Sequence, residues 1–201
     1  MRRSFLFTII ASLLIFSACK KSTEDFVTPP LSDYYPLTVG KYITYSLDSI
    51  VYYTNFGVSA VVKSYQVKHV VDAQITDALG RPAYRIIRFI RSTPTAAWVA
   101  DNTFMAVPGE TSIEFIENNL RYIKLRSAIK QDNSWKGNSY INTSSLSSNL
   151  KYLDDWDYTY DSVDVSATVG AFTLDSTLKV TQRDEIIGDV SSPPQYYSEH
   201  N

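Results

Sequence analysis

The sequence predicts an all-β, mainly antiparallel fold, in the form of a sandwich, a partly closed barrel or a strongly curved sheet. Three observations favour this class. Runs of alternating apolar and polar residues recur along the chain, turn-forming residues separate them at short intervals, and no stretch has the periodicity of a long amphipathic helix. Strands in this rhythm, without helices between them, are typical of antiparallel sheets.

Two long strands are expected first. Residues 42–53 alternate apolar and polar side chains, and residues 58–75 form a second run whose apolar residues share one parity. One buried face is therefore expected on each strand. Residues 55–57, Asn-Phe-Gly, have the composition of a hairpin turn between them.

Further strands follow, each bounded by turn-forming residues. Residues 132–148 are polar and rich in serine, which predicts a long loop around Trp135. In chain order we expect a turn at 77–82, a strand at 84–91, a strand at 97–107, a turn at 108–110, strands at 152–167 and 172–182, and a last strand near Tyr196.

Residues 111–128 fit two local structures. Ile113, Ile116 and Leu120 stand at helical spacing, whereas Asn118 and Asn119 could form the turn of a hairpin. We favour the hairpin, because asparagine tolerates positive φ and the residues that follow are rich in strand formers.

Residues 1–18 have the parts of an export signal peptide. Two arginines precede an apolar stretch over residues 5–16, and small residues stand directly before Cys19. A membrane-spanning helix needs about 20 apolar residues, and lysines at 20 and 21 end this stretch too early. The segment resembles the lipobox of bacterial lipoproteins, which implies cleavage before Cys19 and lipid attachment to its thiol. A plain secretory signal with an incidental cysteine is the alternative.

The rest of the chain is expected to hold one domain. Residues 19–33 are polar and contain Pro29-Pro30, which predicts a flexible tether, so the β-rich domain spans residues 34–201. Cys19 is the one cysteine of the chain, so an internal disulfide cannot stabilise the domain. Removal of residues 1–18 leaves 17 basic and 21 acidic side chains, a net charge of −4, and we expect no nucleic-acid partner.

The three tryptophans are candidate ligand-binding residues. An exposed indole face could stack on a sugar or another planar group. The competing interpretation, which we favour, is that each ring fills a gap in the core, as the tight turn composition after Trp135 indicates. The candidates are Trp98, Trp135 and Trp156.

An acidic run at residues 154–157 is the candidate metal site. Calcium prefers six to eight oxygen ligands, and Asp155 and Asp157 could supply some of them. In a strand, however, these two aspartates would share a solvated face while Trp156 and Tyr158 would lie on the apolar face. We favour the solvated face, and expect no cofactor, with calcium as the alternative.

Motifs of catalysis are scarce. The chain has two histidines and contains no P-loop, Gly-x-Ser-x-Gly elbow or paired-histidine zinc motif. His69 lies within a strand pattern, where a packed or edge position is the simpler interpretation. We therefore expect a noncatalytic structural or binding protein with a protein or glycan partner. The alternative is a hydrolase whose acidic residues come together only in the fold.

Three segments carry a family resemblance. Residues 35–42 (YPLTVGKY), 117–125 (ENNLRYIKL) and 134–138 (SWKGN) resemble uncharacterised lipoproteins of Bacteroidetes. The resemblance implies a lipid-anchored protein of the cell envelope and brings no activity. The residue after Cys19 is not aspartate, which resembles the pattern of outer-membrane sorting; periplasmic and surface orientations both stay open. Those relatives continue past the corresponding end, so the domain is expected to be shortened at its C-terminus.

Overall fold

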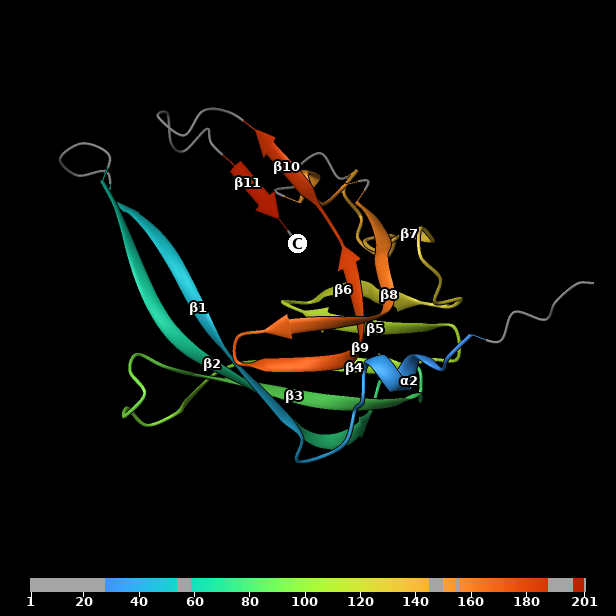
Figure 1. Ribbon diagram of the computed structural model, residues 1–201, viewed down its shortest axis with the longest axis horizontal. Coiled ribbons are helices and arrows are strands. Elements are labelled where there is room, and N and C mark those ends of the chain that lie inside the picture. Colours follow the sequence, from blue (N-terminus) through green and yellow to red (C-terminus); the bar gives the residue numbers. More distant parts are fainter. Residues whose placement is uncertain (1–27, 54–58, 145–149, 155, 188–196, 201) are drawn as a thin grey trace, which may run out of the picture.

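The computed structural model describes residues 28–53, 59–144, 150–154, 156–187 and 197–200. It confirms the all-β class (Figure 1). The signal peptide, Cys19 and most of the predicted tether lie outside the described residues. In chain order the elements are α2 (Leu31–Tyr34), β1 (Tyr42–Tyr53), β2 (Ser59–Thr76), β3 (Pro82–Arg91), β4 (Val99–Pro108), β5 (Ser112–Glu117), β6 (Leu120–Arg126), β7 (Ser134–Lys136), the 3-10 helix η1 (Lys151–Leu153), β8 (Asp157–Val169), β9 (Phe172–Thr181), β10 (Asp184–Ile187) and β11 (Tyr197–His200).

The strands form three antiparallel sheets. Strands β1 to β6 make a six-stranded meander in which each strand pairs with the next along the chain, and this sheet curls into a half-barrel (Figure 1). Strands β7, β8 and β9 make a second sheet, and β10 pairs with β11. Of the three forms expected from the sequence, the strongly curved sheet describes the first sheet best.

Residues 111–128 form the hairpin, and the helical alternative is wrong. The turn between β5 and β6 consists of Asn118 and Asn119, which have φ angles of 51° and 64°. Two consecutive positive φ angles define a type I′ turn, whose twist matches that of the strands it joins. Asparagine is the residue that adopts this conformation most readily after glycine.

The main core lies between the second sheet and the β5–β6 hairpin. Along β8, Tyr158 and Tyr160 are fully buried while Asp157 on the opposite face is exposed, which confirms the predicted alternation. The core residues come from α2, from both sheets and from the loops between them: Leu31, Ile113, Ile123, Leu125, Ile129, Trp135, Leu153, Trp156, Tyr158 and Tyr160.

The predicted loop at 132–148 contains a short strand instead. Residues of β7 pair with β8, with Trp135 opposite Tyr158. Directly after this strand the backbone of Gly137 approaches the ring of Tyr158 so closely that an added Cβ would lie 2.3 Å from the ring. Only glycine fits at this position, because any Cβ would displace a buried tyrosine.

Residues 28–33, predicted as the end of a flexible tether, belong to the packed domain. Leu31 begins helix α2 and is buried in the main core. The hydroxyl of Thr28 accepts a hydrogen bond from the backbone N–H of Ile129 at 3.0 Å. The packed domain therefore begins at about residue 28 and not at residue 34. A single buried leucine among polar residues is a weak sequence signal, and the prolines beside it favoured the tether.

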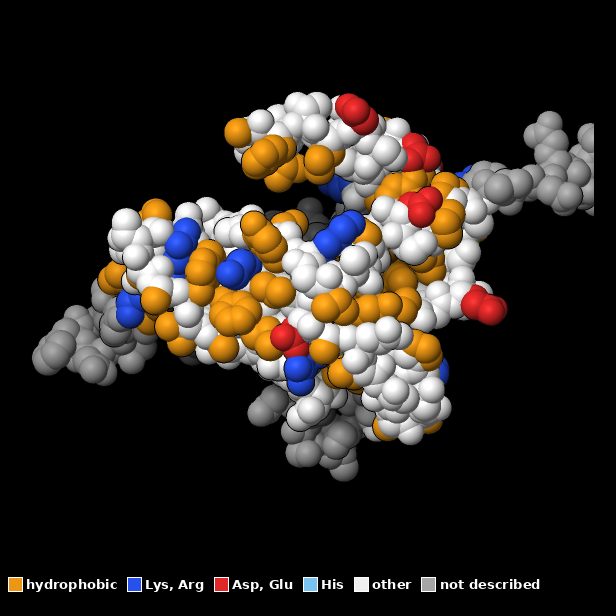
Figure 2. Space-filling view, turned by 90° about the horizontal axis from the view of Figure 1, so that it is seen from below, with side chains coloured by type: hydrophobic (Ala, Val, Ile, Leu, Met, Phe, Trp, Pro, Cys, Tyr) orange, Lys and Arg blue, Asp and Glu red, His pale blue; other side chains and the backbone are white. Residues whose placement is uncertain are grey.

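The expectation of a buried face is wrong for strand β1, where the neighbours Tyr42 and Ile43 are 69% and 64% exposed, and for the outer half of β2. Strand β3 pairs with β2 only over residues 66–76, so the part of β2 before residue 66 has β1 as its one partner. Ile50 and Val62 are about 60% exposed there. In Figure 2, hydrophobic side chains interspersed with Lys and Arg cover the left part of the molecule, which holds this hairpin. Among the described residues no other sheet packs on this part of the hairpin.

The helices of the described residues are α2 and the 3-10 helix η1, and both are short. Within the described part of the chain, no helix has the length and apolar character needed to cross a membrane.

Candidate functional site

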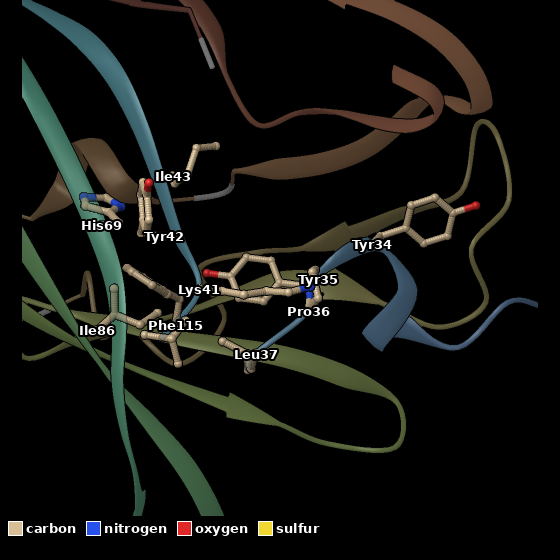
Figure 3. A pocket seen from close by; sticks show the side chains of 11 residues that line it. Tyr34, Tyr35, Pro36, Leu37, Lys41, Tyr42, Ile43, His69, Ile86 and Phe115 are labelled. Atoms are coloured by element: carbon tan, nitrogen blue, oxygen red, sulfur yellow. The ribbon is translucent and has the colours of Figure 1, made fainter. Parts of the chain in front are cut away.

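A cleft of about 310 Å³ opens between the segment that leads into β1 and the inner face of the curled sheet (Figure 3). The segment supplies one wall, and β2, β3 and β5 supply the other. Most of the side chains around it are apolar or aromatic. The lining residues are Tyr34, Tyr35, Pro36, Leu37, Lys41, Tyr42, Ile43, His69, Val71, Ile86 and Phe115.

Backbone hydrogen bonds hold this segment against β2. The N–H of Gly40 donates to the carbonyl of Val71 at 2.8 Å, and the N–H of Val71 donates to the carbonyl of Lys41 at 2.9 Å. Gly40 has a φ of 89°, which glycine adopts without strain and other residues adopt rarely. The turn at Gly40 thus fixes the position of the cleft wall.

A row of aromatic rings forms the floor beside the cleft. Four strands contribute to it: the rings of Tyr45, His69, Phe104 and Phe115 follow one another at centroid distances of 5.2, 5.3 and 5.3 Å. The Tyr45 hydroxyl and His69 Nε2 are 2.9 Å apart and share a hydrogen bond. The first two contacts are edge-to-face and the third is tilted. Aromatic pairs of this kind are stabilised beyond their burial.

Burial favours the neutral forms of two ionisable groups of the cleft, His69 and Tyr35. Burial, and then the positive charge of Arg88, lowers the pKa of His69. Burial raises the pKa of Tyr35 to about 12 and also raises the pKa of Tyr45. At neutral pH His69 and Tyr35 therefore carry no charge, and the part of the cleft beside them suits an apolar or aromatic group.

We expect the imidazole of His69 to titrate below the usual value of 6.5. Because its folded-state pKa is depressed, its neutral form contributes stability above pH 6.5, and this contribution is lost as the pH falls toward the folded-state pKa. Titration of the histidine signals by NMR checks this, with the His69 signal assigned by its loss in His69→Gln. A midpoint at or above 6.5 would contradict the burial of this ring.

Two of the three candidate tryptophans are core residues. Trp135 and Trp156 are each 5% exposed. The indole N–H of Trp135 donates to the carbonyl of Ile123 at 2.8 Å, and that of Trp156 donates to Tyr152 at 2.7 Å. The favoured interpretation as core-filling rings is correct, and neither indole offers an exposed face on which a ligand could stack.

Trp98 has a different environment, outside the cleft. Its ring is half-buried and contacts two cations of the chain, Lys68 at 4.8 Å and Arg91 at 4.3 Å. Lys68 also lies 5.2 Å from the ring of Phe89. Cation–π contacts at such partly exposed sites contribute about 0.5–1 kcal/mol each. Trp98 thus helps to order the outer surface of β2 and β3.

The described residues of the acidic run do not form a metal site. Asp155 lies outside the described residues. Asp157 is exposed and pairs with Lys136 at 3.0 Å. Among the described residues, no group of three or more potential metal ligands gathers within reach of one ion.

Two buried carboxylates and two arginines form a network that was not predicted from the sequence. Glu114 accepts hydrogen bonds from the guanidinium of Arg81 at 2.9 and 3.2 Å and from that of Arg121. Arg81 also donates to Asp77 at 2.8 Å. Asp77 in turn accepts the backbone N–H groups of Leu79 and Arg81, which closes the turn before β3.

The charges of this network are fixed by its contacts. Burial alone would raise the pKa of Glu114, but the hydrogen bonds from Arg81 and Arg121 outweigh it, and the net effect lowers the pKa. The backbone N–H of Arg81, with its guanidinium, lowers the pKa of Asp77. Both carboxylates stay ionised near neutral pH and are neutralised by arginine, so their role is structural.

This network predicts an acid-sensitive fold. Folding lowers the pKa of both carboxyl groups, whose unfolded-state pKa values are 4.5 for Glu114 and 3.8 for Asp77. The two groups therefore stabilise the folded state at pH values above these, and the stabilisation is lost as the pH falls through their folded-state pKa values. The urea concentration at the unfolding midpoint should therefore fall when the pH is lowered below about 4.5. Glu114→Gln should weaken this dependence of the urea midpoint on pH. An unchanged dependence in that variant would contradict the role given to Glu114.

These features define a mainly antiparallel β protein with an apolar, aromatic cleft between its N-terminal segment and a curled sheet. Comparisons with family models, with curated proteins and with solved structures find no match.

Proposed function

We propose that this chain is a noncatalytic, lipid-anchored protein of the cell envelope whose cleft binds an apolar group of a protein partner. The observation that carries the proposal is the lining of the cleft by tyrosine, proline and aliphatic side chains at the inner face of the curled sheet. Apolar clefts of roughly 300–1,000 Å³ with a few polar groups are typical of binding sites.

The chemistry of the lining favours a protein partner over a glycan. A buried hydroxyl without a hydrogen-bond partner costs about 2–7 kcal/mol, and a sugar carries several hydroxyls. The polar groups at the cleft are few: tyrosine hydroxyls, the amine of Lys41 and the imidazole of His69. An aromatic or aliphatic side chain of a partner needs no such hydrogen bonds.

The proposed anchor would keep the cleft close to the membrane. Eight residues lie between Cys19 and Thr28, where the packed domain begins. Fully extended, they span about 30 Å. Lipid on Cys19 would therefore restrict the partner to proteins in or near the same membrane. Cell fractionation tests the anchor: the wild-type chain should be recovered with membranes, and Cys19→Ser should not.

Site-specific photo-crosslinking in intact cells tests the cleft. Benzoylphenylalanine replaces Tyr42, an exposed residue that lines the cleft, and in a matched control it replaces Tyr140, which is exposed elsewhere. We expect a discrete adduct from position 42 only. Val71→Phe, which fills the cleft from β2, should abolish it.

The identity of the adduct decides between partners. The proposal is supported if protease digests the adduct and mass spectrometry finds peptides of another protein in it. An adduct that resists protease and yields to glycosidase would favour the glycan instead. Equal adducts from positions 42 and 140 would remove the cleft as the binding site.

A further inference from the structure

The free edge of the curled sheet is strand β1, and we propose that two copies of this chain pair antiparallel through it. Strand β1 ends the six-stranded meander, and its one partner in the described structure is β2. Pairing of two β1 strands would join two six-stranded sheets into one. In this pair the two copies of Leu47 would lie opposite each other, with the twofold axis between them.

Strand β1 lacks the devices that normally keep an edge from pairing. Such edges are usually short, bulged, or guarded by lysine or proline. Strand β1 is 12 residues long, pairs with β2 in one unbroken register, and contains a single charged residue, Asp48. Its exposed side chains include Tyr42 and Ile43 at 69% and 64%. An edge of this kind is a template for another strand.

The hydrogen bonds of β1 show which residues face outward. The carbonyl of Lys41 accepts the N–H of Val71, its neighbour across the ladder. In an antiparallel pair, residues that bond to the partner alternate with residues whose N–H and C=O point away. The odd-numbered residues of β1 therefore bond to β2, and the even-numbered residues present free backbone groups at the edge.

This alternation restricts the register of a symmetric pair. Even-numbered residues of one copy must lie opposite even-numbered residues of the other, so the two longest registers centre on Leu47 or on Asp48. Centring on Asp48 sets two carboxylates directly opposite each other, which is destabilising.

Centring on Leu47 sets Ser46 opposite Asp48, which allows a hydrogen bond and separates the charges. The same register sets Ile43 opposite Val51, a pair of strand-forming side chains. The strand is thus complementary to itself in one register. A second copy is the occupant that explains why both halves of β1 carry similar kinds of residue, Tyr-Ile-Thr-Tyr-Ser before the centre and Asp-Ser-Ile-Val-Tyr after it.

Disulfide trapping tests the register in the full chain, with Cys19→Ser so that the introduced thiol is the only one. Opposite Leu47 positions form a non-hydrogen-bonded pair with Cα atoms about 4.5 Å apart, within the range of a disulfide. Ser46 of one copy lies opposite Asp48 of the other, so the two Ser46 Cα atoms are offset by two residues and lie about 8 Å apart, beyond that range. We expect Leu47→Cys to convert mostly to a linked dimer under mild oxidant, and Ser46→Cys to stay monomeric.

A proline variant tests the edge itself. Because the N–H of Ser46 points away from β2, Ser46→Pro removes an outward donor and keeps the β1–β2 ladder. It should abolish trapping by Leu47→Cys, whereas Ser46→Thr should not. Equal trapping at positions 46 and 47, or none at position 47, overturns the proposal. These two cysteine variants decide the question even if Ser46→Pro fails to fold.

Discussion

Replacing Trp135 by alanine should lower the free energy of unfolding by about 3–5 kcal/mol. The indole lies in the main core, with ring centroids 4.6 Å from Tyr160 and 5.8 Å from Tyr158. Its loss removes a large apolar area from the core, leaves a cavity between two sheets, and deprives the carbonyl of Ile123 of its donor. Urea unfolding followed by tyrosine fluorescence and circular dichroism measures the change.

Trp98→Ala is the matched control for this experiment. It removes the same side chain from a half-buried position where the ring contacts Lys68 and Arg91 rather than the core. We expect a loss of about 1–2 kcal/mol. Similar losses in the two variants would contradict the distinction between a core tryptophan and a surface one.

Glu114→Gln should cost about 3 kcal/mol of stability. Removing one partner of a buried ion pair costs about 3–5 kcal/mol, because the other charge is left without compensation. The lower end applies here, since the side chains of Arg81 and Arg121 are 37% and 27% exposed and water can solvate them in part. Equilibrium unfolding in urea at pH 7 measures the difference.

The control for this substitution is Asp72→Asn. Asp72 pairs with Arg85 on the surface, where both side chains are substantially exposed. Exposed ion pairs contribute about 0–1 kcal/mol, so this variant should be close to wild type. If both variants lose the same stability, Glu114 has no special role in joining the turn before β3 to β5 and β6.

The sequence predicted those parts of the fold that depend on local patterns. Two consecutive asparagines specified the turn between β5 and β6, and alternation around Tyr158 specified the buried face of β8. In both cases the signal lies within a few adjacent residues. Several strand boundaries agreed within about two residues for the same reason, because turn-forming residues mark where a strand ends. The strand predicted at 152–167 begins only at Asp157, because residues 151–153 form the 3-10 helix η1, and β10 was not predicted.

Features that depend on distant contacts were missed. Leu31 is buried by residues more than eighty positions later in the chain, and β7 is a strand because β8 lies beside it. The pairing of Arg81 with Glu114 spans 33 positions. A local pattern carries no information on such partners.

The cleft could not be predicted from the sequence for a related reason. Its walls come from residues 34–43 and from β2, β3 and β5, and each of these residues has an ordinary structural role in its own segment. The tryptophans stood out in the sequence because they are rare, but rarity also marks the residues best suited to fill a core.

The meander order of the first sheet has a consequence for how the chain folds. Each of the strands β1 to β6 pairs with the one before it, so the sheet can grow by one hairpin at a time as the chain is synthesised. The newest strand is always covered by the next to arrive. Strand β1, made first, is never covered by a later strand of that sheet, and its backbone groups are open from the first hairpin to the finished fold.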